Sequence, residues 1–140
     1  MSILTTYRLR LARKRWRIRA MRKRHELRPV VSRVGAIRPD SLLLFSTLRN
    51  ELVRLPYFLR YYRELGINHF LIVDNGSDDG SDALLAAQAD VSLWRTTAGY
   101  KASRFGVDWV TWLLARYGHG HWCLTLDADI LLRLIVNIRN

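Results

Sequence analysis

Short apolar runs alternate with amphipathic segments over residues 41–129, and this pattern predicts strands that alternate with helices. Four continuous apolar runs are typical of buried strands, and they are residues 42–45, 69–73, 91–94 and 121–126. Helices are predicted between them, at residues 55–65, 82–88 and 105–117. This regular alternation predicts the α/β class, with a mostly parallel sheet and helices on both of its faces.

Charged side chains follow several of these strands. Asp74 comes directly after the second run, Lys101 lies in the loop after the third, and Asp127 and Asp129 follow the fourth. In a parallel sheet the turns after the strands gather at one edge, where ligands bind, so we expect these side chains to converge. Carboxylate oxygens suit Mg²⁺ or Mn²⁺, and Mg²⁺ is usually held by one or two carboxylates plus substrate phosphates. The pattern predicts a metal-bound phosphate compound as ligand, although Asp-x-Asp taken alone also fits a plain polar turn.

Two other features near this edge leave alternatives open. Residues 74–81 combine two glycines with Asp, Asn and Ser, which predicts a tight turn with Ser81 as the N-cap of the next helix. This turn matches no phosphate, dinucleotide or calcium loop, and a plain connection is the alternative. Lys101 and Arg104 precede the 105–117 helix, where its dipole does not favour cations; they either face a negative ligand or form a solvated pair. We interpret His69, which opens the second strand, as structural.

Charge is concentrated at the N-terminal end of the chain. The net charge of +11 lies entirely within residues 1–40, and residues 41–140 are neutral. We therefore divide the chain into a basic arm and linker, 1–40, and an α/β domain, 41–140. The apolar positions of the arm fit no single period, so we predict no packed structure for it, and residues 29–39 are interpreted as the linker. A solvated extension, attachment to an anionic membrane surface, nucleic-acid binding and an organelle presequence remain alternatives, with nucleic acid disfavoured because no reading module accompanies the bases.

Cysteine content and hydropathy bear on the compartment. Cys123 is the only cysteine, which excludes an intrachain disulfide and favours a reducing compartment. No apolar run reaches the roughly 20 residues that span a bilayer, and the N-terminus lacks the apolar core of a secretory signal. We expect a cytoplasmic protein, with peripheral contact at the inner face of the membrane through the arm as an alternative.

Four motifs, taken in order and spacing, resemble the nucleotide-sugar half of family 2 glycosyltransferases. They are residues 45–51 (Phe-Ser-Thr-Leu-Arg-Asn-Glu), 73–81 (Val-Asp-Asn-Gly-Ser-Asp-Asp-Gly-Ser), 99–101 (Gly-Tyr-Lys) and 126–129 (Leu-Asp-Ala-Asp). The similarity is greatest to the bacterial branch with the Arg-Asn-Glu start and the Asp-Ala-Asp end. The resemblance covers residues 42–129, and it implies a GT-A (Rossmann-like) fold that binds a nucleoside diphosphate sugar.

The resemblance also implies roles for individual residues. Asp74 would contact the base or ribose, the 47–51 turn would line the same pocket, and Lys101 with Arg104 would lie near the diphosphate. Asp127 and Asp129 would hold a divalent metal, Mn²⁺ or Mg²⁺, that bridges the two phosphates as a Lewis acid. The complete set assigned to the nucleotide sugar is Thr47, Asn50, Glu51, Asp74, Asn75, Gly76, Lys101 and Arg104.

The chain departs from the family pattern after Asp129. Ile130 stands where this branch usually has Glu, and only eleven residues follow Asp129, whereas family members continue through an acceptor site and an acidic general base. We therefore expect a truncated or frame-shifted product whose general base lies beyond the chain end. Two hypotheses follow: a glycosyltransferase, or its donor-binding half, with a glycan or other acceptor; and a non-catalytic remnant or binding protein that acts through its basic arm on a membrane surface or nucleic acid.

Overall fold

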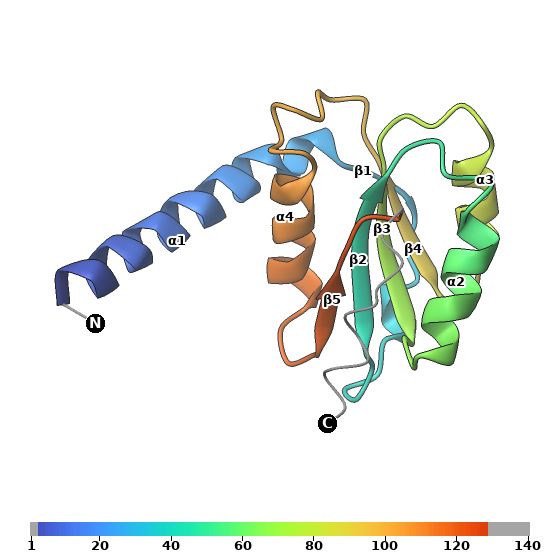
Figure 1. Cartoon of the computed structure of the whole chain (residues 1–140), viewed down its shortest axis with the longest axis horizontal. Coiled ribbons are helices and arrows are strands. Elements are labelled where there is room, and N and C mark those ends of the chain that lie inside the picture. Colours follow the sequence, from blue (N-terminus) through green and yellow to red (C-terminus); the bar gives the residue numbers. More distant parts are fainter. Residues whose placement is uncertain (1–2, 129–140) are drawn as a thin grey trace.

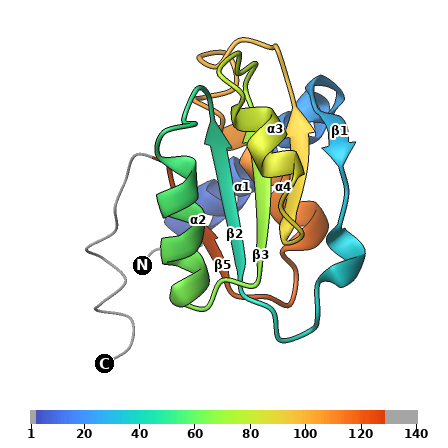
Figure 2. The same cartoon turned by 90° about the vertical axis from the view of Figure 1, so that its right-hand side faces the viewer.

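A five-stranded mixed sheet lies between two layers of helices (Figures 1 and 2); this computed structural model describes residues 3–128. The strands are β1 (Arg28–Val31), β2 (Leu43–Leu48), β3 (His69–Asp74), β4 (Val91–Arg95) and β5 (Cys123–Thr125), and they lie in the order β1-β4-β3-β2-β5. Strands β2 to β5 are parallel to one another, and β1 pairs antiparallel with β4. The predicted α/β class and mostly parallel sheet are confirmed.

Helices cover both faces of the sheet, as predicted. They are α1 (Ile3–Lys23), α2 (Leu55–Glu64), α3 (Ser81–Ala86) and α4 (Val107–Tyr117), with short 3₁₀ turns η1 (Arg24–Glu26) and η2 (Val34–Ala36). Helices α2 and α3 lie on one face, and α4 lies on the other with α1 against it (Figure 2). Side chains of each strand alternate between the two layers. Thus Leu44 and Ile72 join the core with α2, while Phe45 and Val73 pack with Trp109 of α4.

Several element boundaries differ from the prediction. Strand β2 continues through residues 46–48, beyond the end of the predicted strand at residue 45, and Leu48 pairs with Asp74. Helix α3 begins at Ser81 rather than after it, because Gly80 occupies the N-cap in a left-handed conformation. Helix α4 begins at Val107, two residues later than expected, since Arg104 and Phe105 both have positive φ.

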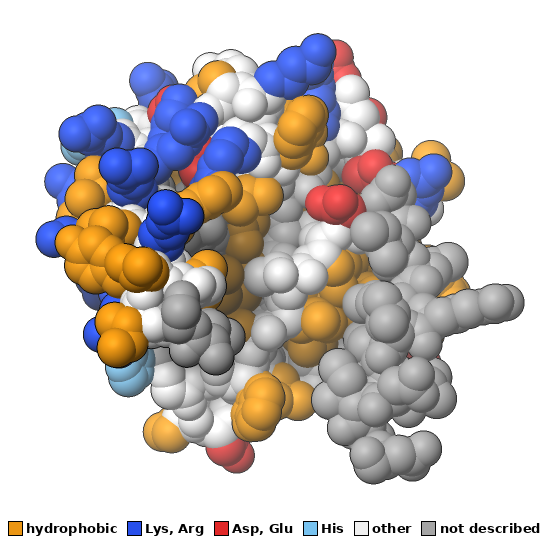
Figure 3. All heavy atoms as spheres, turned by 60° about the vertical axis from the view of Figure 1, so that its left-hand side comes forward, with side chains coloured by type: hydrophobic (Ala, Val, Ile, Leu, Met, Phe, Trp, Pro, Cys, Tyr) orange, Lys and Arg blue, Asp and Glu red, His pale blue; other side chains and the backbone are white. Residues whose placement is uncertain are grey.

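The N-terminal arm is helical, which corrects the expectation that it has no packed structure. Helix α1 spans 21 residues, and its C-terminal part packs on α4, where Ala20 is buried. Arg, Lys, Leu and Ala are strong helix formers, which explains the helix in the absence of a single apolar stripe. The N-terminal part projects from the body (Figure 1), and Lys and Arg side chains gather with hydrophobic ones on that side of the molecule (Figure 3).

The linker and the last strand also need correction. Within residues 29–39, Pro29 belongs to β1 and pairs with Trp94, at a sheet edge where a missing N–H is tolerated. Strand β5 is parallel to β2, as predicted, but it is not buried: in the described part of the chain it is an edge strand, and Cys123 and Thr125 are exposed. Among residues 3–128, no helix is both long and apolar enough to cross a bilayer.

His69 is buried inside the sheet layer, which agrees with a structural role. Its Nε2 lies 2.8 Å from the hydroxyl of Ser92 on the neighbouring strand. Burial, which disfavours the charged ring, lowers the pKa of His69 below its ordinary value of 6.5. The folded chain therefore holds a neutral imidazole at pH values where the unfolded chain binds a proton.

This difference predicts a pH-dependent stability. Because the unfolded state binds the proton more readily, the free energy of unfolding should fall as the pH drops through 6.5, by at most about 1.4 kcal/mol per pH unit from this group. In urea titrations at several pH values, His69→Gln, which does not titrate, should show a smaller decrease than the wild type. The control is His119→Gln, at an exposed position. Equal slopes for the wild type and His69→Gln would contradict the assignment.

Candidate functional site

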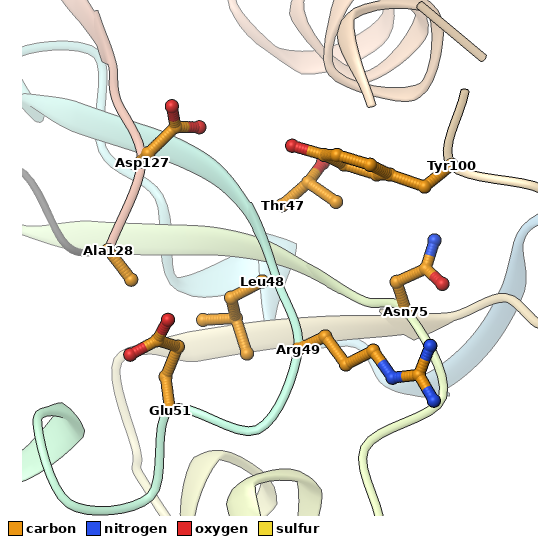
Figure 4. A pocket seen from close by; sticks show the side chains of 8 residues that line it. All are labelled: Thr47, Leu48, Arg49, Glu51, Asn75, Tyr100, Asp127 and Ala128. Carbon is orange, nitrogen blue, oxygen red and sulfur yellow. The ribbon is translucent and has the colours of Figure 1, made fainter. Parts of the chain in front are cut away.

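The parallel pairing of β2 with both β3 and β5 places the carboxyl ends of these strands at one edge of the sheet. Leu48 pairs with Asp74 on one side, and Phe45 pairs with Thr125 on the other. A pocket of about 320 Å³ opens at this edge (Figure 4). It is lined by Thr47, Leu48, Arg49, Glu51, Asn75, Tyr100, Asp127 and Ala128.

The charged groups of the pocket are separated in space. In Figure 4 the carboxylates of Asp127 and Glu51 lie on the side of Ala128, while the Arg49 guanidinium and the Asn75 amide lie on the other side. The ring of Tyr100, from the loop after β4, reaches in with its hydroxyl directed toward the Asp127 side. The pocket therefore combines one acidic side with a cation and an amide opposite.

Buried polar atoms without a hydrogen-bond partner cluster beside this pocket. Within residues 3–128 they are Ser46 Oγ, Thr47 Oγ1, Asp74 Oδ1 and Asn75 Nδ2. Ser46 and Thr47 lie near the end of β2, Asp74 ends β3, and Asn75 directly follows it. Thr47 and Asn75 are among the residues that line the pocket. Leaving such a group unpaired costs about 1–3 kcal/mol, so native structures rarely do it without a reason. A polar ligand in the pocket would supply partners for Thr47 and Asn75.

Asn50 holds two turns together. It adopts a positive φ of 53°, its N–H donates to the Ser77 hydroxyl at 2.9 Å, and its Oδ1 accepts from the Asp78 N–H at 2.9 Å. The next N–H, of Glu51, donates to the hydroxyl of Ser81 at 3.0 Å. The Ser81 hydroxyl thus binds this turn, whereas the sequence predicted that Ser81 would be the N-cap of α3. Asn50 thus positions the pocket turn and is absent from its lining.

Asp74 and Gly76 lie behind the pocket wall. Asp74 is fully buried, and its Oδ2 accepts from the Ser77 N–H at 3.1 Å and lies 3.9 Å from Arg95 Nη1. Gly76 has a φ of +71°, which the tight turn requires. Of the residues expected to contact the nucleotide sugar, the pocket lining therefore includes Thr47, Glu51 and Asn75 but not these two.

Arg104 pairs with a carboxylate of the chain itself. This contact corrects the two interpretations of Arg104, as a residue that faces a negative ligand or as part of a solvated pair. It forms an ion pair with the buried carboxylate of Asp108, in the first turn of α4, and its guanidinium lies 3.7 Å from the centre of the Trp16 ring. Arg19 of α1 donates to the same carboxylate at 2.9 Å. Lys101 is exposed and does not line the pocket. The structure therefore brings neither cation to the pocket.

The predicted metal ligands are described in part. Asp127 follows β5 and lines the pocket with its exposed carboxylate, whereas Asp129 lies outside the described residues. Among residues 3–128 no group of three or more His, Cys, Asp or Glu side chains is arranged to hold a metal. Asp127 and Glu51 supply two carboxylates from different turns, and Glu51 Oε2 also accepts from Arg54 Nη1 at 3.0 Å. Carboxylate oxygens suit a hard cation that completes its coordination with substrate oxygens.

Two lining residues, Arg49 and Tyr100, were not singled out individually from the sequence. Arg49 directly follows β2, and Tyr100 lies in the loop after β4, so both stand beyond strand ends on the ligand-binding side of such a sheet. Arg49 makes no ion pair with a carboxylate of residues 3–128. The signal that could have found them is their place after a strand rather than their residue type.

Close packing behind Thr47 yields a prediction. Gly106, with a φ of +81°, precedes α4, and a Cβ there would lie 2.8–2.9 Å from the Thr47 side chain. Gly106→Ala should therefore lower the free energy of unfolding by about 1–3 kcal/mol and displace Thr47. Gly120→Ala is the matched control for backbone strain, because Gly120 has a φ of +82° with nothing within 4 Å. Denaturation showing equal losses for the two variants would refute the steric contact.

Comparison of the chain with family models, with curated proteins and with solved structures gave no match.

Proposed function

We propose that the pocket binds a nucleoside diphosphate sugar together with a divalent cation, and that the chain is the donor-binding part of a family 2 type glycosyltransferase with a GT-A fold. The observation that carries the proposal is the convergence of Asp127, Glu51 and Arg49 with two unpaired polar groups at one sheet edge. The pocket volume of about 320 Å³ falls within the range of small-molecule sites.

The acidic side of the pocket suits the cation. Asp127 and Glu51 offer carboxylate oxygens, and Asp129 would add a third. Mg²⁺ or Mn²⁺ bound there would act as a Lewis acid that neutralises charge on the diphosphate. The same carboxylates without a cation would repel a diphosphate, so donor binding should depend on the metal.

The opposite side suits the nucleotide. The Arg49 guanidinium has the planar fork of donors that binds phosphate oxygens in pairs, and it is exposed to the pocket. Asn75 Nδ2 and Thr47 Oγ1 would gain hydrogen-bond partners from ribose or base. The Tyr100 ring offers a face on which a base can stack. We assign binding of the sugar donor to these residues. Transfer of the sugar would require a general base, and these residues do not include one.

The first test is metal-dependent binding. Calorimetry on the full chain with uridine and guanosine diphosphate sugars should give heat with Mn²⁺ present and lose it when EDTA is added. Asp127→Asn should weaken this binding by about tenfold or more, because a charged donor to the cation is lost. Glu64→Gln, at an exposed position at the end of α2, is the control and should bind as the wild type does. Failure of every nucleotide sugar to bind in Mn²⁺ would reject the proposal.

The second test addresses the phosphate contact. Arg49→Ala should lower the affinity for the nucleotide sugar by about tenfold, and Arg49→Lys should recover part of it, because Lys keeps the charge without the paired donors. Arg60→Ala removes an exposed arginine from α2 and serves as the control. An unchanged dissociation constant in Arg49→Ala would exclude this side of the pocket as the phosphate site.

A further inference from the structure

Helix α1 carries nine Lys and Arg residues and no Asp or Glu over its 21 residues. Its C-terminal part packs on α4, and its N-terminal part projects from the body (Figure 1). Neither feature is needed for a ligand at the sheet edge. The basic composition and the projection of α1 therefore need an explanation that is independent of the proposed function.

Two apolar stripes lie on opposite sides of α1. The inner stripe faces α4 and the loop before it: Ala20 is buried there, and Trp16 lies under Arg104. The outer stripe has the 3-4-7 spacing of a single helix face. It consists of Leu4, Tyr7, Leu11 and Ile18, which are 74, 61, 39 and 42 % exposed. Because the two stripes oppose each other, the sequence shows no single apolar side, although each stripe is regular.

Basic residues border the outer stripe on both sides. An arginine lies four residues after each of Leu4, Leu11 and Ile18, so one base lies beside each of these three side chains. The bordering bases are Arg8, Arg15 and Arg22 on one side and Arg10 and Arg17 on the other, with Lys14 within the stripe. None of these six forms an ion pair with a carboxylate in the described part of the chain. Their charges are therefore available to a partner.

We infer that the outer face of α1 docks on a bilayer that contains anionic lipids. Such a surface offers apolar depth for the outer stripe and negative headgroups for the bases on its two sides, as interfacial helices require. A nucleic-acid backbone would pair with the bases but leave Leu11 and Ile18 in water. A second copy of the chain would oppose nine like charges with nine more. Charge and apolar surface together fit the bilayer.

Docking would also act on the helix that contacts the loop beside the candidate pocket. Arg19 of α1 donates to Asp108 and to the carbonyl of Ala102, and Arg104 stacks on Trp16. These contacts tie α1 to the loop that carries Tyr100 into the pocket. A docked helix would hold this loop in place without contributing a side chain to the pocket lining.

The test measures binding of the full chain to phosphatidylcholine vesicles with and without phosphatidylglycerol, by flotation. Binding should require the anionic lipid and weaken as salt is raised. Leu11→Ser should weaken it about tenfold, since Leu11 lies in the outer stripe. Leu9→Ser is the matched control: Leu9 lies two positions away on the opposite side of the helix, is 48 % exposed, and should leave binding within about twofold.

Tyr7→Ser is a second outer-stripe variant, with circular dichroism to show that each variant keeps its helix content. Three results would overturn the inference. They are absence of binding to anionic vesicles, equal weakening by Leu9→Ser and Leu11→Ser, and tight binding to RNA or DNA that Leu11→Ser does not change. Because no nucleotide sugar enters this experiment, its outcome is separate from that of the calorimetry.

Discussion

The parallel pairing of β2 with strands on both of its sides is the constraint on which the rest of this structure depends. It brings Thr47, Asn75 and Asp127, which are far apart in the sequence, to one edge. The register is fixed because both faces of β2 are covered by helices: a slip by one residue would turn Phe45 away from Trp109 and place Thr47 in the apolar layer. The pocket is thus a consequence of how the core packs.

A buried carboxylate joins the basic helix to this framework. Asp108 receives one guanidinium from α1, Arg19, and one from the loop before α4, Arg104. Removing either partner would leave part of a buried charge unpaired, which is costly in a way that a surface ion pair is not. Glu26, which accepts from the indole N–H of Trp109 at 2.8 Å, adds a second polar link between the arm and α4. The C-terminal part of α1 is therefore tied to the folded body, while its N-terminal part projects from it (Figure 1).

Sequence pattern predicted most of the fold and part of the candidate site, for identifiable reasons. Apolar runs and strand order determine where strand ends meet, so the position of the pocket at the carboxyl edge was predictable from topology. Of the side chains expected to converge there, however, only Asp127 lines the pocket among residues 3–128, while Asp74 is buried and Lys101 does not line the pocket. Side-chain direction did not follow: Arg104 pairs with Asp108, four residues on, and does not line the pocket. Helix α1 was missed because its apolar residues lie on two opposite sides, so the sequence shows no single apolar face. Strand β1 was missed because its proline, which a sheet edge tolerates, was interpreted as part of a linker.

Strain and unpaired polar groups concentrate at one edge of an otherwise consistent structure. Within residues 3–128, the non-glycine residues with positive φ are Asn50, Arg104 and Phe105, and all three lie in loops that flank the pocket. The unpaired atoms of Thr47 and Asn75 lie at the same edge. Stability alone would favour relaxed turns and apolar side chains at these positions, since each such feature costs about 1–3 kcal/mol. Their gathering around one pocket, beside opposed acidic and basic groups, is what a site shaped for a charged ligand would require.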